Sequence, residues 1–152
     1  MITLDFTGKT VLVTGGSRGV GRGIAERFLA AGANVAICGR SEPASLPKVG
    51  RNEAFFVPAD VRETEQVDGL VAKTLERFGR LDVLVANAGG EPAVDAATVS
   101  PRFHEKIVHL NLIAPLHCAQ RANAAMQQQP EGGVIVFITS VSGMRPSPGT
   151  AA

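Results

Sequence analysis

The sequence predicts an α/β protein with a doubly wound parallel sheet between two layers of helices. Short apolar runs alternate along the chain with segments whose apolar residues recur at helical spacing. This alternation is typical of parallel strands joined by crossover helices. Within the runs, apolar residues are continuous rather than alternating with polar ones, as in strands that are buried on both faces. Right-handed crossovers then give a three-layer α/β/α arrangement.

Five apolar runs are expected to form the strands of this sheet. Residues that favour turns follow the runs, for example Thr14, Gly15 and Gly16 after the first and Pro58 after the third. We expect the strands to lie in the spatial order 3-2-1-4-5. No boundary divides the chain, so residues 1–152 are predicted to form a single domain. The runs comprise residues 11–13, 35–38, 54–57, 81–86 and 134–138.

Helical periods fill the gaps between the strands. The first helix is predicted over residues 21–31, with Gly32 as its C-terminal residue in a left-handed conformation. The clearest period covers residues 67–78, where the apolar positions form one stripe, and Gly79 closes it. Residues 41–52 are rich in Pro, Gly and Ser, and we expect a loop there with at most one helical turn.

A long third helix is predicted to begin after Ser100, which is placed as an N-cap before Pro101. It is expected to continue to about Gln129. A proline interrupts its hydrogen bonding, because Pro115 lacks the N–H that would bond to the carbonyl of Asn111 four residues earlier. We therefore expect the helix to bend there and to leave this carbonyl without its helical partner.

Composition excludes several classes of protein. The 152 residues are 45% hydrophobic and 19% charged, with a formal net charge of +1, which argues against disorder and against a strong field for nucleic acid or acidic membranes. No apolar stretch approaches a membrane span and no secretory signal precedes the domain, so a cytoplasmic protein is expected. Cys38 and Cys118 are too few for a disulfide framework, and we expect both to be reduced. No metal site is predicted.

A glycine-rich loop at residues 14–21 follows the first strand and opens the first helix. A phosphate group at a helix N-terminus needs bare backbone N–H groups, and Gly15, Gly19 and Gly21 provide them without a Cβ in the way. The helix dipole adds a field that favours an anion. Glycines also serve tight turns, but this position in a doubly wound sheet is where dinucleotides bind. The loop is not a Walker A motif, because no Gly-Lys-Ser/Thr ends it.

The spacing Thr-Gly-x-x-x-Gly-x-Gly in this loop resembles the short-chain dehydrogenase/reductase family. One residue departs from the family pattern, since Ala86 stands where an Asn usually precedes Asn-Ala-Gly. The resemblance implies a Rossmann-like fold and hydride transfer between a nicotinamide cofactor and a carbonyl or secondary alcohol. Further matches follow in the family's order at Asp60-Val61 after the third strand, Asn87-Ala88-Gly89 after the fourth, Asn111 in the long helix and Ser140 after the fifth.

Site roles follow from this resemblance. Ser140 would hydrogen-bond the reacting oxygen, and the carbonyl of Asn111 would hold a water of a proton relay. Asp60 would meet the adenine. Taken alone, each of these residues is more commonly a turn or surface residue, and the family alignment is what raises them to site residues. The predicted cofactor-binding residues are Gly15, Ser17, Arg18, Gly19, Val20, Gly21, Arg40, Asp60, Val61, Asn87, Ala88 and Gly89.

The end of the second strand indicates which cofactor form binds. An acidic residue there would accept hydrogen bonds from the ribose 2′-hydroxyl of NAD(H). Gly39 stands in that place, Arg40 follows it, and Arg18 lies in the glycine loop. Two guanidinium groups and no carboxylate suit a 2′-phosphate. The sequence therefore favours NADP(H), with NAD(H) as the alternative.

The proton donor of the family is missing from the sequence. Its tyrosine usually lies thirteen positions after the active serine, directly beyond Ala152, and the chain contains no tyrosine. We expect this residue, a nearby lysine and a strand that covers the apolar run 134–138 to belong to a longer protein. The alternative is a dinucleotide-binding module without turnover. The resemblance also implies a small-molecule substrate and a homo-oligomer that packs through the long helix.

Overall fold

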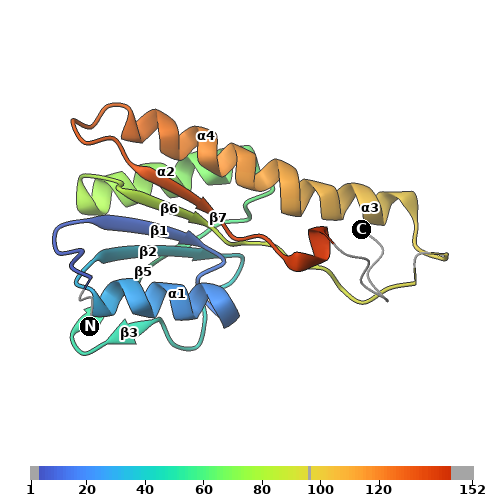
Figure 1. The fold of residues 1–152 in the computed structure, drawn as a ribbon, viewed down its shortest axis with the longest axis horizontal. Coiled ribbons are helices and arrows are strands. Elements are labelled where there is room, and N and C mark those ends of the chain that lie inside the picture. Colours follow the sequence, from blue (N-terminus) through green and yellow to red (C-terminus); the bar gives the residue numbers. More distant parts are fainter. Residues whose placement is uncertain (1–3, 96, 145–152) are drawn as a thin grey trace.

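Parallel strands form one sheet with helices on both faces (Figure 1). The computed structural model describes residues 4–95 and 97–144, so the ends of the predicted domain lie outside the described residues. The five-stranded sheet has the order β5-β2-β1-β6-β7, which confirms the predicted topology. Helix α1 covers one face, and α2 and α4 cover the other (Figure 1). The strands are β1 (Thr10–Thr14), β2 (Asn34–Gly39), β5 (Phe55–Pro58), β6 (Val83–Ala86) and β7 (Val134–Phe137).

The central strands are buried on both faces, as their continuous apolar runs predict. Successive residues point to opposite sides of a strand, so each run feeds two cores. Val11 and Val13 belong to the core under α1 (Gly19–Ala30). Leu12 between them belongs to the core under α2 (Thr64–Phe78) and α4 (Ala114–Met126). The apolar runs are thus explained by burial in two layers at once.

Glycines end the first two helices as predicted. Gly32 has a φ of +86° and follows α1, and Gly79 has a φ of +76° and follows α2. Both angles lie in the left-handed region, which glycine adopts without a steric penalty. The apolar stripe of α2 is buried through Val67, Leu70 and Val71.

The predicted third helix runs without a break from Pro101 to Met126, close to the expected end at about Gln129. It consists of α3 (Pro101–Val108), a π-helical turn η1 (His109–Ile113) and α4. Ser100 does cap α3, since its hydroxyl accepts a hydrogen bond of 3.3 Å from the N–H of Phe103. The altered hydrogen bonding falls where Pro115 predicts it: the N–H of Ala114 bonds back to the carbonyl of His109, five residues earlier.

A correction concerns residues 41–52, which were expected to form a loop with at most one helical turn. They contain most of a small antiparallel hairpin, β3 (Lys48–Val49) and β4 (Asn52–Glu53). Gly50 has a φ of +58° in its turn. The hairpin rests on α1, where the Asn52 side chain donates to the carbonyl of Leu29 over 3.3 Å. The loop prediction fails because two-residue strands with exposed side chains leave no period in a sequence.

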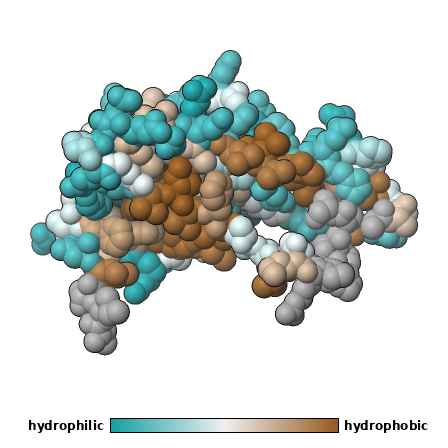
Figure 2. Space-filling view, turned by 45° about the horizontal axis from the view of Figure 1, so that its top comes forward, coloured by the Kyte–Doolittle hydropathy of each residue, from teal (hydrophilic) through white to brown (hydrophobic). Residues whose placement is uncertain are grey.

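Apolar side chains remain exposed on two parts of the molecule. Strand β7 lies at the edge of the sheet, where Val134 is 58% exposed and Phe137 is 45% exposed. The second group, Val108, Leu112 and Leu116, follows the helical segment from α3 into α4. Figure 2 shows both groups as apolar surface on one side of the molecule. Within the described residues, no helix has the length and apolar character to cross a membrane.

Candidate functional site

A cavity of about 760 Å³ opens at the carboxyl ends of β1, β2, β5 and β6. Ligands of doubly wound folds bind at this edge of the sheet, where the segments after neighbouring strands converge. Further lining residues come from η1 and from the end of β7, through Leu110 and Ile138. The cavity brings together every residue predicted to bind the cofactor, namely Gly15, Ser17, Arg18, Gly19, Val20, Gly21, Arg40, Asp60, Val61, Asn87, Ala88 and Gly89.

The glycines of the loop have different physical reasons for being glycine. A Cβ on Gly21 would lie 2.4 Å from the carbonyl oxygen of Gly15, so Gly21 permits the close packing of α1 on the turn before it. Gly15 has a φ of +65°, and its Cβ would lie 3.1 Å from the Cα of Ala88. Gly19 has a φ of +54°, and its Cβ would meet no atom within 4 Å. Gly19 therefore leaves the first turn of α1 open toward the cavity, where its N–H groups can meet an anion.

A side chain in the same motif joins the ends of two strands. The hydroxyl of Thr14 accepts hydrogen bonds from the N–H of Asn87 at 3.0 Å and of Ala88 at 2.9 Å. In return, the Asn87 side chain donates to the carbonyl of Thr14 over 2.9 Å. The sequence placed Thr14 in the turn after the first strand but did not predict it as a site residue. Its place as the first residue of the glycine motif was the one sequence signal for a role in the site. Its hydrogen bonds to Asn87 and Ala88, which lie 73 and 74 positions later, could not be foreseen from the sequence.

The hydroxyl of Ser17 is the most informative polar group of the cavity. Its oxygen is buried and has no hydrogen-bond partner within the described part of the chain. A buried hydroxyl without a partner is costly, and such groups frequently mark a place where a ligand binds. A Cβ on Gly39 would lie 3.0 Å from this oxygen, so the missing side chain leaves space beside it. Arg18 and Arg40 line the same cavity, and neither has an ion-pair partner among residues 4–95 and 97–144.

Asp60 is held by an arginine that the sequence analysis missed. Arg62 donates from Nε to one carboxylate oxygen over 2.9 Å and from Nη2 to the other over 2.5 Å. These hydrogen bonds hold the pKa of Asp60 below its usual range, although burial acts in the opposite direction, and the charge of Arg40 lowers it further. Asp60 is therefore a carboxylate at neutral pH. Arg62 follows the Asp60-Val61 pair directly, but nothing in that spacing shows which way its side chain turns.

Both cysteines are buried and free, as expected. Burial raises the pKa of the Cys38 thiol to about 11 and that of Cys118 to about 12. Cys38 lines the cavity as a protonated thiol and adds apolar surface rather than a nucleophile. In the described part of the chain, no three or more His, Cys, Asp or Glu residues are grouped so that they could hold a metal ion.

The predicted catalytic residues lie beside the cavity rather than in its wall. Asn111 uses its carboxamide on Gly90: Oδ1 accepts from the N–H at 3.0 Å and Nδ2 donates to the carbonyl over 3.2 Å. The hydroxyl of Ser140 accepts from the N–H of Ser142 at 3.1 Å. Leu110, adjacent to Asn111, and Ile138, two positions before Ser140, do line the cavity. The catalytic roles of Asn111 and Ser140 stay predictions.

Comparison with known proteins adds to this geometry. The family described as short chain dehydrogenase has a model that matches residues 9–152. The chain belongs to the short-chain dehydrogenase family. It is 38% identical over 138 residues to the 3-oxoacyl-[acyl-carrier-protein] reductase MabA of Mycobacterium tuberculosis, which covers 91% of this chain and 53% of the relative. It is 41% identical over 112 residues to the L-fucose dehydrogenase of Oryctolagus cuniculus, covering 71% of this chain and 39% of the relative.

Solved structures of short-chain dehydrogenases share the fold. Levodione reductase superimposes with a TM-score of 0.87 at 31% identity, over 96% of this chain and 59% of the other. A putative short-chain alcohol dehydrogenase from Sinorhizobium meliloti 1021 gives a TM-score of 0.85 at 31% identity, over 98% and 61% of the two chains. The resemblance inferred from the motifs is thus confirmed. The present chain spans about half the length of several curated relatives that it matches, such as 53% of the MabA reductase.

Proposed function

We propose that the chain belongs to an NADP(H)-dependent oxidoreductase that transfers a hydride between the nicotinamide and a small carbonyl or secondary alcohol. Membership of the short-chain dehydrogenase family and relatives named as reductases and dehydrogenases support the reaction class. The observation that carries the cofactor preference is the buried Ser17 hydroxyl, which finds no partner in the described residues. It lies beside the space at Gly39, on the same cavity as Arg18 and Arg40.

This corner of the cavity suits a 2′-phosphate better than a bare ribose hydroxyl. The phosphate would offer acceptor oxygens to the Ser17 hydroxyl, and the guanidinium groups of Arg18 and Arg40 can each donate two hydrogen bonds to it. An acidic side chain at residue 39 would favour the ribose hydroxyl instead. Such a side chain would also start 3.0 Å from the Ser17 oxygen and crowd it. Gly39 removes both the competing charge and the crowding.

Other residues of the cavity would bind the rest of the cofactor. The open first turn of α1 at Gly19 would hold the pyrophosphate through its N–H groups. The Asp60 carboxylate can accept a hydrogen bond from the adenine amino group, and the buried Val61 offers an apolar surface beside it. When bound, the cofactor supplies the hydride. Ser140 would then donate a hydrogen bond to the reacting oxygen, and the Asn111 carbonyl would hold a water of the proton relay.

Cofactor titration tests the preference. Followed by fluorescence, NADPH should bind more tightly than NADH to the full chain. Arg40→Ala should weaken NADPH binding by roughly 5–30-fold, because it removes charge-assisted hydrogen bonds that solvent partly screens. The NADH affinity of this variant should stay within about twofold of that of the unmodified chain, since NADH lacks the 2′-phosphate. Equal affinities of the unmodified chain for the two cofactors would refute the assignment.

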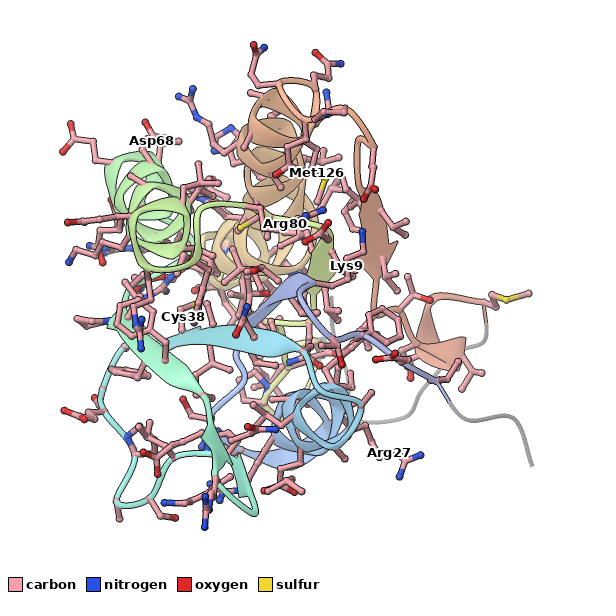
Figure 3. All side chains as sticks on the ribbon, turned by 90° about the vertical axis from the view of Figure 1, so that its left-hand side faces the viewer. Lys9, Arg27, Cys38, Asp68, Arg80 and Met126 are labelled. Atoms are coloured by element: carbon pink, nitrogen blue, oxygen red, sulfur yellow. The ribbon has the colours of Figure 1, made fainter. Side chains whose placement is uncertain are left out.

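Two further variants make the titration specific to this corner. Ser17→Ala should lower NADPH affinity in the same direction as Arg40→Ala, because it removes a hydroxyl donor. Arg27→Ala is the matched control: Arg27 is an exposed arginine of α1 that points outward from the helix (Figure 3). A loss of NADPH affinity with Arg27→Ala as large as with Arg40→Ala would mean that overall charge, and not this corner, governs binding.

A dinucleotide-binding module without turnover is the second candidate, because these 152 residues contain no tyrosine. Hydride delivery to a carbonyl leaves an alkoxide that needs a proton, and the hydroxyl of Ser140 is a poor acid near neutral pH. A polypeptide limited to residues 1–152 should therefore bind NADPH and consume none with a ketone. Intact mass confirms that the polypeptide is limited to these residues, and the absorbance of NADPH shows whether the cofactor is consumed. Consumption at a rate normal for an enzyme would show that another acid is present.

A further inference from the structure

The segment that follows β2 forms the wall of the cavity next to the proposed 2′-phosphate site. Arg40, Ser41 and Pro43 all line the cavity. Residues 41–47 have neither helix nor strand, since regular structure resumes only with β3 at Lys48. The position of Arg40 relative to a ligand therefore depends on what holds this irregular segment.

The two ends of the segment are fixed by the sheet and the hairpin. At the first end, the carbonyl of Gly39 accepts from the N–H of Ala59 at 3.0 Å. At the second end, the carbonyl of Pro47 accepts from the N–H of Ala54 at 2.9 Å. Between these points the backbone would be free to shift, unless a side chain holds it.

Arg22 on α1 holds the segment between its ends. Its Nη1 donates to the carbonyl of Ser45 over 2.8 Å and its Nη2 to the carbonyl of Leu46 over 3.2 Å. In the part of the chain that the structure describes, no other side chain donates a hydrogen bond to the backbone of residues 41–46. Leu46 also packs against the apolar core under α1. Arg22 thus joins the helix that opens at the glycine loop to the wall that carries Arg40.

The guanidinium of Arg22 is itself oriented. Its Nε donates to Glu26, one helical turn later, over 2.9 Å, which turns the remaining donors toward the two carbonyls. The side chain is 31% exposed, so these hydrogen bonds are partly shielded from water. Since Arg22 follows Gly21 directly, the same helical turn would position both the pyrophosphate site and the wall beside the 2′-phosphate.

We infer that Arg22 is a positioning residue for recognition of the 2′-phosphate, acting by holding residues 41–46 so that Arg40 stays directed at the ligand. The inference rests on the proposed NADP(H) preference. If the segment is already held in place, no free energy is spent on ordering it when the ligand binds. If it is loose, the cost of ordering it lowers the affinity for the ligand. This cost should fall on NADPH, whose phosphate uses Arg40, much more than on NADH.

Cofactor titration of the full chain with Arg22→Met tests the inference. Methionine keeps the apolar stem and a high helix propensity but has no donor. NADPH affinity should fall about tenfold while NADH affinity changes less than about twofold. Arg22→Lys, which retains one ammonium donor group, should recover part of the loss. Arg27→Met on the same helix is the control and should leave both affinities unchanged.

A double mutant separates positioning from a general structural role. If Arg22 acts through Arg40, Arg22→Met should cost little NADPH affinity in the Arg40→Ala background. Additive losses would overturn the inference, and so would equal losses of NADPH and NADH affinity, because a merely structural role would affect both. The inference would also be overturned if Arg22→Met and Arg22→Lys both kept the ratio of NADPH to NADH affinity of the unmodified chain. Failure of the proposed function is distinct, since it appears as equal NADPH and NADH affinities before any substitution.

Discussion

Replacing Asp82 by asparagine perturbs the end of the sheet opposite the cavity. The carboxylate is only 9% exposed and accepts hydrogen bonds from the N–H of Thr10 at 2.8 Å and from Nε of Arg80 at 2.8 Å. Lys9 lies 3.6 Å from it, and Figure 3 shows Lys9 and Arg80 near each other at this end. Glu131, before β7, pairs with both cations and completes the group. Asp82 therefore joins the starts of β1 and β6 and, through shared cations, the approach to β7.

Asparagine preserves the shape of Asp82 but removes its charge. It also replaces one acceptor oxygen with an NH₂ group, which cannot accept hydrogen bonds from the donors around Asp82. Hydrogen bonds to charged groups contribute about 1.5–3 kcal/mol each. The cations around Asp82 are partly solvated, so the lower part of that range applies. We expect a loss of about 2 kcal/mol in the free energy of unfolding at pH 7, which corresponds to a fall in Tm of roughly 4–8 °C at this chain length.

The loss should depend on pH in a direction that follows from the pKa of Asp82. Burial alone would raise this pKa, but hydrogen bonds from Arg80 and Thr10 and the charges of Arg80 and Lys9 lower it below its ordinary value of 3.8. A lowered folded pKa gives stabilisation that is present above the unfolded pKa and is lost as pH falls through the folded pKa. The difference between the two proteins should therefore be full at pH 7 and close progressively below about pH 4.

Urea unfolding of both proteins across this pH range measures the difference. Asp68→Asn is the matched control, because Asp68 pairs with Arg121 on the surface, where the two side chains are 45% and 53% exposed. It should cost less than about 0.5 kcal/mol. A loss for Asp82→Asn that is the same at pH 3 as at pH 7 would refute the charge-based reasoning. A loss no larger than that of Asp68→Asn would refute the role of burial.

Two further predictions concern packing. Gly21→Ala should destabilise the fold by about 1–3 kcal/mol, because the new Cβ would lie 2.4 Å from the Gly15 carbonyl oxygen. In Gly23→Ala, on the same helix, the new Cβ would meet no atom within 4 Å, and the substitution should stabilise the fold by up to about 1 kcal/mol. If urea unfolding gives stability changes of the same sign for the two variants, the packing argument is contradicted. For the complete protein, light scattering should find a homo-oligomer. Leu112 and Leu116 are 54% and 48% exposed and leave apolar surface along the helix from α3 into α4. A monomer at micromolar concentration would count against this prediction.

The sheet was predictable because its strands are buried on both sides. Val11 and Leu12 lie in different cores, so selection for burial acts on every residue of the strand and produces the apolar run. The hairpin at Lys48–Val49 and Asn52–Glu53 was not predictable, because it owes its place to contacts with α1 rather than to its own pattern. Short elements that depend on distant partners leave little signal in the local sequence.

The candidate site divides in a similar way. Residues such as Gly15 and Asp60 lie within two positions of a strand end, so topology alone brings them to one edge of the sheet. The contacts of Thr14, Arg22 and Arg62 were not foreseen, because each depends on the direction that a side chain takes after the backbone is placed. Motif spacing can therefore indicate where a cavity forms before it can indicate what stiffens its walls.

Asn111 shows how a residue can carry two roles that a sequence cannot separate. The π-helical turn over His109–Ile113 lies just before Pro115. Pro115 has no N–H to donate to the main-chain carbonyl of Asn111, and this would hold for any residue at position 111. The side chain explains why the residue is asparagine, since its carboxamide pairs with both the N–H and the carbonyl of Gly90. Aspartate could accept from that N–H but has no donor for the carbonyl, and leucine has neither group. A proton-relay role would thus rest on the carbonyl of residue 111, whereas its carboxamide fixes the turn after β6 against the helix.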